Sequence, residues 1–295
     1  MRRQKSLYLR STAFLTLLAL ATACSSKATD PILQEPIMSP KTTMVQRLEA
    51  LPAPARMPVV AVYEFQDQTG QHKPSDNKAE YSRAVTQGAV NILVKALVDA
   101  GQGKWFTVIE RSGLQNLLQE RQIIRATRDE YADKEGKKLP MVGPLLNAGV
   151  ILEGGVVSYE SNTVTGGAGA RYLGIGLSTQ YRQDEVTVYL RAVSVQSGKV
   201  LASVNTTKTI YSASANASIY RYVALDKIFE AETGFSHNEP PQFALRQAIE
   251  LAVYGLIIEG TKQGLWEFAD KAKGAKVVGE FDKKLGAKPV ESASK

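Results

Sequence analysis

The sequence predicts an α+β fold, in which a layer of strands and helices carries two β-hairpins. Three observations lead to this prediction. From residue 59 to residue 158, short runs of β-branched residues alternate with segments of helical spacing. Residues 159–237 then lose helical spacing and become rich in Gly, Ser, Thr, Ala and Tyr. A mostly apolar segment, Phe243–Ile258, predicts a further helix within residues 238–268.

The αβ segment, residues 59–158, supplies its elements in a regular order. Continuous apolar runs bounded by turn residues predict buried strands, and apolar positions three and four residues apart predict helices. The expected elements are a strand at 59–63, a helix at 82–100, a strand at 106–109, a helix that begins after Ser112, and a strand at 150–152.

The two ends of the mature chain show no such pattern. Residues 24–58 contain six prolines that interrupt each short apolar run, which predicts an extended tether. Residues 269–295 are rich in lysine and only weakly apolar, which predicts a solvated tail.

The chain begins with the pattern of a bacterial lipoprotein signal. Basic residues precede an apolar run at 13–23, which is far shorter than the roughly 20 residues of a membrane-spanning helix. Cys24, the only cysteine, follows this run directly. We therefore expect residues 1–23 to be removed and Cys24 to carry lipid. Ser25 follows where an aspartate would indicate the inner membrane, so the outer membrane is the expected location. The alternative is a general signal peptide with an incidental cysteine.

Composition argues against several other functions. The 36 basic residues outnumber the 29 acidic ones by seven, and four basic residues lie in the leader, so the mature charge is +3. Such a small excess gives no electrostatic argument for nucleic-acid binding. The two histidines, His72 and His237, cannot form a two-histidine metal helix, and no nucleophile motif occurs. Gly166–Gly176 lacks the spacing of a phosphate loop. We expect no enzymatic activity, no metal and no cofactor besides the lipid on Cys24.

Residues 159–237 are predicted to form two hairpins, the first at 159–195 and the second at 196–237. A shorter alternation also occurs at 186–192. The second hairpin is expected to have one strand at 211–219, a bend between 221 and 227, and a return strand around 229–236. The expected lipid-facing residues are Tyr211, Ala213, Ala215, Ala217, Ile219, Phe229 and Phe235. The expected water-facing residues are Ser212, Ser214, Asn216, Ser218, Glu230 and Glu232.

Alternation alone does not decide whether these hairpins enter a membrane. Hairpins of a water-soluble sheet with one buried face alternate in the same way. A thin apolar face of Ala and Tyr, opposite Ser, Asn and Glu, favours a wall between lipid and water. Four strands cannot close a barrel, since a small barrel needs about eight, and an open edge in lipid leaves backbone groups unpaired. If the strands insert, several copies must share one barrel.

Eight segments, in order between about residue 50 and residue 268, match the motifs of one known family. They are VY at 62–63, QDQTGQHKP at 66–74, ERSGLQNLLQERQIIRA at 110–126, YESN at 159–162, GGAGARYLGIG at 166–176, SVNTTKTI at 203–210, NEP at 238–240 and GLW at 264–266. On these motifs the chain resembles the CsgG family, the curli secretion channel of Gram-negative outer membranes.

The resemblance implies a lipid-anchored nonamer in which each subunit lends two hairpins to one shared transmembrane β-barrel, above a periplasmic αβ ring. Such a channel exports unfolded curli subunits from the periplasm by diffusion, without ATP. The implied partners are the amyloid subunit, its nucleator and two accessory factors. The competing hypothesis is a monomeric lipoprotein that regulates envelope machinery through its αβ domain.

The resemblance also implies a pore constriction in the loop of residues 75–81, where the family has rings of Tyr, Asn and Phe. Tyr81 takes the place of the Phe, and Glu80 falls where the Asn is expected. Ser75 or Asp76 falls where the Tyr is expected, so the outer aromatic ring is missing, and Asn77 could supply an amide. The alternative is a solvated loop with Tyr81 in the helix core.

Overall fold

A computed structural model describes residues 38–69, 88–130, 142–165, 180–216, 219–223 and 240–286. The chain divides into two compact units, residues 1–40 and 41–295. Of the first unit the structure describes residues 38–40, which have no regular secondary structure. The fold described below is that of the second unit.

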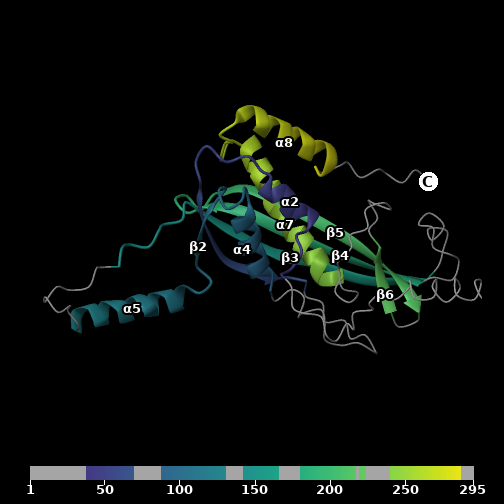
Figure 1. Ribbon diagram of the computed structural model, residues 1–295, viewed down its shortest axis with the longest axis horizontal. Helices are drawn as coiled ribbons and strands as arrows, with labels where there is room; N and C mark the ends of the chain where they lie inside the picture. Colours follow the sequence, from purple (N-terminus) through teal and green to yellow (C-terminus); the bar gives the residue numbers. More distant parts are fainter. Residues whose placement is uncertain are drawn as a thin grey trace, which may run out of the picture. The chain divides into compact units, whose positions relative to one another are not determined.

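A six-stranded mixed sheet lies at the centre of this unit (Figure 1). The strand order is β2-β1-β3-β4-β5-β6. The strands are β1 (Val59–Asp67), β2 (Thr107–Glu110), β3 (Val150–Thr165), β4 (Gln180–Ser194), β5 (Val200–Asn216) and β6 (Ile219–Val223). Strand β1 pairs in parallel with β2 and β3, and the other neighbours pair antiparallel. Parallel neighbours need a crossover, which α4 (Ala89–Asp99) supplies between β1 and β2.

Helices cover one face of the sheet. Helix α7 (Pro240–Lys262) packs on β4 and β5, and α4 packs beside it on β1. Helix α2 (Thr43–Glu49) contacts both, while α8 (Lys271–Lys284) lies against α7 (Figure 1). Helix α7 is apolar around most of its circumference because the sheet and three helices bury it. Its buried apolar residues are Ala244, Leu245, Ala248, Ile249, Ala252, Val253, Tyr254, Leu256, Ile257 and Ile258.

An aromatic cluster closes the end of α7. Trp105 packs edge-on against Trp266 and Phe268, with ring centroids 6.0 and 5.5 Å apart. Trp266 donates a hydrogen bond from Nε1 to the carbonyl oxygen of Ile257, 2.8 Å away. Gly260 lies directly under the Trp266 ring, where a Cβ atom would come within 2.3 Å of it. Trp266, which follows the helix, thus folds back onto it.

The prediction of an extended tether over residues 24–58 is wrong at Thr43–Glu49, which form α2. The prolines flank this segment rather than interrupt it. Thr42 caps the helix, since its Oγ1 accepts a hydrogen bond from the backbone N–H of Val45 at 3.0 Å. Met44, Val45 and Leu48 are buried, so a short apolar face docks the helix.

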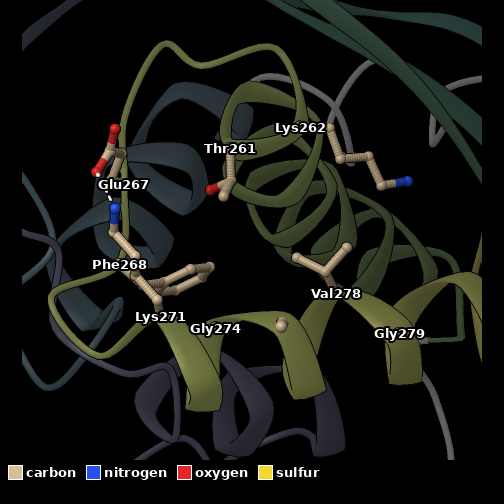
Figure 2. A pocket seen from close by; sticks show the side chains of 9 residues that line it. Thr261, Lys262, Glu267, Phe268, Lys271, Gly274, Val278 and Gly279 are labelled. Carbon is tan, nitrogen blue, oxygen red and sulfur yellow. Dashed lines mark ion pairs between the residues drawn. The ribbon is translucent and has the colours of Figure 1, made fainter.

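The prediction of a solvated tail over residues 269–295 is wrong at Lys271–Lys284, which form α8. Asp270 caps the helix by accepting a hydrogen bond from the N–H of Lys273 at 3.0 Å. Phe281 is buried against Tyr254, and Gly274 lies against Phe268 (Figure 2). Phe281 and Gly274, together with the half-buried Val277 and Val278, dock a helix whose lysines remain in water. Residues 287–295 lie outside the described residues.

Two glycines of α8 provide a matched test of this docking. A Cβ on Gly274 would come within 2.5 Å of the Phe268 ring, whereas a Cβ on Gly279 would meet nothing within 4 Å. The aromatic cluster holds Phe268 in place, so Gly274→Ala should lower the free energy of unfolding by about 1–3 kcal/mol. Gly279→Ala should raise it by up to about 1 kcal/mol, because alanine favours helix. Urea unfolding of both variants measures this, and equal losses would contradict the docking of α8.

Candidate functional site

The candidate site is the part of the sheet that extends past strand β1. Strand β1 pairs with β3 no further than Asp67 opposite Val156. Beyond that point the sheet consists of β3, β4, β5 and β6, side by side (Figure 1). We call this part the distal sheet, and it comprises residues 158–165, 180–187, 207–216 and 219–223.

The first predicted hairpin is present, with arms β3 and β4. They pair from Val150 opposite Ser194 to Thr165 opposite Gln180. The hairpin therefore begins at residue 150 rather than 159, since β3 belongs to the αβ core and the distal sheet at once. Its connection, residues 166–179, lies outside the described residues.

The prediction of one strand over residues 211–219 is wrong. Strand β5 ends at Asn216 and β6 begins at Ile219, which lies opposite Asn216. Strands β5 and β6 are therefore antiparallel neighbours on either side of residues 217–218, which lie outside the described residues. Asparagine favours turns, and β6 has the aromatic and β-branched composition of a strand. These two signals could have placed the turn correctly.

The structure separates the predicted site residues into two groups. Tyr211, Ser212, Ala213, Ser214, Ala215 and Asn216 lie on β5, and Ile219 lies on β6. An irregularity in the β5–β6 register between Ser214 and Asn216 interrupts the two-residue period on which the assignment of faces depends. Cys24, Ser75, Asp76, Asn77, Glu80, Tyr81, Ala217, Ser218, Phe229, Glu230, Glu232 and Phe235 lie outside the described residues.

The alternation at 186–192 belongs to the core rather than to a membrane face. Its apolar residues, Val186, Val188, Leu190 and Ala192, are buried on the side of the sheet that the helices cover. A strand therefore shows the same alternation of apolar and polar residues whether helices or lipid cover its apolar face.

The opposite face of the sheet is polar, and its side chains pair across strands. Arg191 of β4 forms an ion pair with Glu153 of β3 at 2.7 Å. The hydroxyl oxygens of Thr187 and Thr207 lie 2.9 Å apart. The Thr209 hydroxyl donates to Glu185 at 3.0 Å. Such cross-strand pairs suit a face in contact with water.

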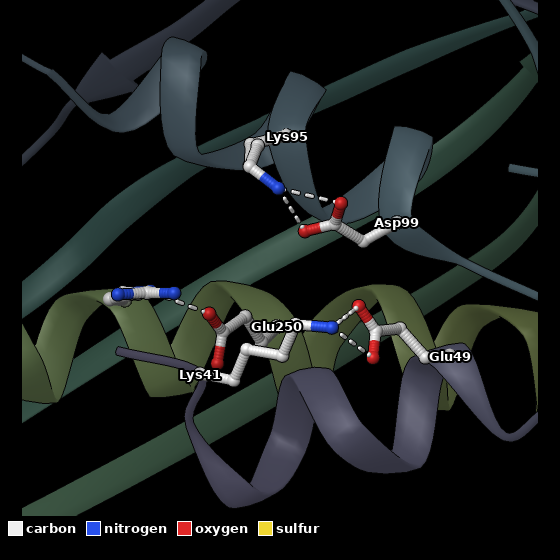
Figure 3. Close-up of polar contacts among 6 residues, drawn as sticks. Lys41, Glu49, Lys95, Asp99 and Glu250 are labelled. Atoms are coloured by element: carbon white, nitrogen blue, oxygen red, sulfur yellow. Dashed lines mark hydrogen bonds and ion pairs between the residues drawn. The ribbon is translucent and has the colours of Figure 1, made fainter. Parts of the chain in front are cut away.

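A buried polar contact fixes the start of the second unit. Glu250 of α7 (Figure 3) is only 2% exposed. It accepts hydrogen bonds from the Thr42 hydroxyl and from Nε of Arg246, the latter at 2.8 Å. Burial raises the pKa of Glu250, while Thr42 and Arg246 oppose that rise and Asp99 adds to it. Thr42 thus attaches the first residues of this unit to α7.

Two further ion pairs surround this contact. Lys41 lies 2.7 Å from Glu49, and Lys95 lies 2.6 Å from Asp99 (Figure 3). Both pairs are exposed on the lysine side, so they add little stability.

The described part of the chain contains neither a metal-binding cluster nor a helix able to span a membrane. In those ranges, no three His, Cys, Asp or Glu side chains are grouped so as to bind a metal ion. None of the helices within them combines the length and the hydropathy needed to cross a bilayer.

Comparison with known proteins identifies the family. The family model described as curli production assembly/transport component CsgG matches residues 41–283. The chain belongs to the CsgG family. Curated proteins of that name from Salmonella typhimurium and from Escherichia coli K12 are each 42% identical over 238 residues, which cover 81% of this chain and 84% of theirs. The resemblance found in the sequence motifs is confirmed.

A solved structure shows a weaker likeness. The PelC dodecamer from Paraburkholderia phytofirmans is 15% identical and aligns over 70% of this chain and 92% of its own, with a TM-score of 0.32. That score is too low to support an argument about this CsgG-family chain.

The buried carboxyl predicts a pH-dependent stability. The pKa of Glu250 is higher in the folded than in the unfolded protein, so its contribution is fully present below about pH 4.3 and is lost as the pH rises through the folded value. Wild type should therefore lose stability relative to Glu250→Gln between pH 4 and pH 7.5. Urea unfolding of both proteins across this range measures the difference. A difference that does not change with pH would contradict the raised pKa.

Proposed function

We propose that this protein is an outer-membrane lipoprotein that serves curli assembly as a homo-oligomeric pore, a nonamer by family resemblance. In this proposal the pore exports unfolded curli subunits from the periplasm to the cell surface. The observation that carries it is membership in the CsgG family, with curated relatives of 42% identity that are named curli production assembly/transport components.

The edges of the distal sheet support an oligomer. Among the described strands, β6 pairs only with β5, and β3 beyond Val156 pairs only with β4. Each copy thus has two edges, which in lipid would leave backbone groups unpaired at several kcal/mol each. If β6 of one copy pairs with β3 of the next, both edges are satisfied. Repetition of this head-to-tail contact closes a ring when the rotation between neighbouring copies divides a full turn evenly.

The remaining parts of the proposal follow from the sequence. A lipid on Cys24 anchors each copy, and several acyl chains in one oligomer anchor it firmly where one would not. The αβ core faces the periplasm, which holds no ATP, so the exported chain moves by diffusion. The partners are the curli subunit, its nucleator and accessory factors, as the family resemblance implies.

Electron microscopy and conductance together test this proposal. Full-length protein solubilised in detergent should form rings with ninefold symmetry and a central hole, and it should produce discrete conductance steps in planar bilayers. A monomer that extracts without detergent and does not conduct would contradict the proposal. That result would favour the alternative, a monomeric lipoprotein that regulates envelope machinery.

Tyr81 provides a test of the pore constriction. If its ring narrows the pore, Tyr81→Ala should increase the entry of large antibiotics into cells that express the protein. Tyr63→Ala is the matched control, because Tyr63 lies on β1 with 44% of its surface exposed and outside the loop of residues 75–81. Equal antibiotic sensitivity of the two variants, at equal expression, would contradict a role of Tyr81 in the constriction.

A further inference from the structure

The end of strand β1 is held by hydrogen bonds to two other strands. The backbone N–H of Gln68, which directly follows β1, donates to the carbonyl of Val156 on β3 at 2.8 Å. The side chain of Gln68 donates from Nε2 to the hydroxyl oxygen of Tyr189 on β4 at 3.1 Å. Asp67 accepts hydrogen bonds from the backbone N–H of Thr69 at 3.0 Å and from its hydroxyl at 2.7 Å. These bonds fix the position and the direction of residues 67–69, which we call the β1 exit.

Two adjacent glycines of β3 let the neighbouring strands approach closely beside the β1 exit. A Cβ on Gly155 would come within 2.6 Å of the carbonyl oxygen of Gln66 and within 3.0 Å of the Tyr189 ring. A Cβ on Gly154 would come within 2.5 Å of the Phe65 ring. Such a close approach of backbone and rings requires glycine. The Tyr189 ring is therefore held against the β3 backbone, next to the end of β1.

Among the described strands, β3 is the only one that pairs with the last part of β1. Strand β2 ends at Glu110 opposite Val62, and helix α5 (Leu114–Glu130) follows it. The pairing of β1 with β3 continues from Phe65 to Asp67. The position of the β1 exit therefore depends on its contacts with β3 and β4.

Irregular strand pairing flanks the β1 exit. The β1–β3 register shifts between Val62 and Phe65, and the β3–β4 register shifts between Val156 and Ser158. Bulges of this kind bend a strand or end its pairing, and they are over-represented next to active sites. Both shifts lie within a few residues of the last β1–β3 pair, Asp67 opposite Val156. The exit is thus a specific local feature rather than a continuation of the regular sheet.

The β1 exit leads to the loop of residues 75–81, which the proposed function assigns to the pore constriction. Residues 70–74 connect the two and lie outside the described residues. A chain segment from residue 69 to residue 75 spans at most about 22 Å, at roughly 3.6 Å per residue. The place and the direction of the exit therefore limit where the loop can lie.

We propose that Gln68 and Tyr189 are positioning residues of the pore constriction. Their hydrogen bond ties the β1 exit to β4 and so orients the loop of residues 75–81 in each copy. The bond recurs in each copy of a ring, which keeps the loops equivalent around the axis. The inference rests on the proposed pore and adds to it two residues that lie outside the loop itself.

Deletion of the Tyr189 hydroxyl tests this role. Tyr189→Phe removes the acceptor of the Gln68 bond and keeps the ring that lies against Gly155. In planar bilayers its open-channel current noise should be several-fold greater than that of wild type, because the loops are held less uniformly. Gln68→Leu should produce the same increase, and the double variant should add nothing to it, since both changes remove the same contact.

Hydrogen exchange measures the order of the β1 exit directly. Loss of a hydrogen bond shifts a local equilibrium by about 2–10-fold. In Tyr189→Phe rings, the backbone amide of Thr69 should therefore exchange faster by that factor. Mass spectrometry of peptides that cover residues 66–70 measures the rate.

The matched control is Arg191→Leu, which removes the ion pair between Arg191 of β4 and Glu153 of β3. Arg191 lies two residues beyond Tyr189 and thus on the same face of the strand. This variant should keep the current noise of wild type and the exchange rate of wild type at Thr69.

The outcomes separate this inference from the proposed function. Conducting rings of Tyr189→Phe with the noise of wild type, or an equal increase in Arg191→Leu, would overturn the inference and leave the pore proposal standing. Because Gln68 is exposed, Gln68→Leu leaves the core intact and decides the question should Tyr189→Phe fail to assemble. Wild-type protein that forms no conducting ring would overturn both.

Discussion

Burial of α7 is the constraint on which the rest of the fold depends. This helix contacts two strands and three helices, and it joins them through polar as well as apolar contacts. The Thr206 hydroxyl of β5 donates to the carbonyl of Ala248 at 2.8 Å. Glu250 holds Thr42 at the cap of α2, and Ile257 accepts the indole N–H of Trp266. Helix α2, before β1, and helix α8, after α7, therefore both use α7 as a docking surface.

The sequence predicts those parts of the fold whose buried residues form a continuous local pattern. Protein surrounds two of the elements on nearly every side and excludes water from them: the strand at 59–63 and the helix at 243–258. Both are therefore apolar, and composition and spacing identify them. Helices α2 and α8 escaped prediction because each docks through few residues. Phe281 and Gly274 account for much of the docking of α8, and a pattern that sparse cannot be distinguished from a solvated helix or tail.

The candidate site shows a different limit of sequence reasoning. Alternation predicts a strand with two unlike faces, but it does not identify what covers the apolar face. Val186, Val188 and Leu190 alternate because helices cover them, and the pattern extends along the same strand into the distal sheet. The break between β5 and β6 is marked only by Asn216 and by the composition of β6, since the Ala and Ser residues on either side of Asn216 have similar size and weak preference. A shift of one residue moves each side chain to the other face.

The continuity of β4 and β5 connects the two halves of the sheet mechanically. In the helix-covered half, Leu190 and Ala192 are fully buried, and burial of such side chains contributes roughly 1.5–3 kcal/mol for each large one. In the distal sheet this cover extends at least to Val186 and Ile210, which are also buried. Strands that emerge from a packed core keep its orientation, because hydrogen-bonded registers are continuous from Ala192 opposite Ala202 to Tyr181 opposite Ala213. The core thus fixes where the distal strands point before any neighbour is present. In the proposed oligomer, contacts between copies then need only align cores that are already folded.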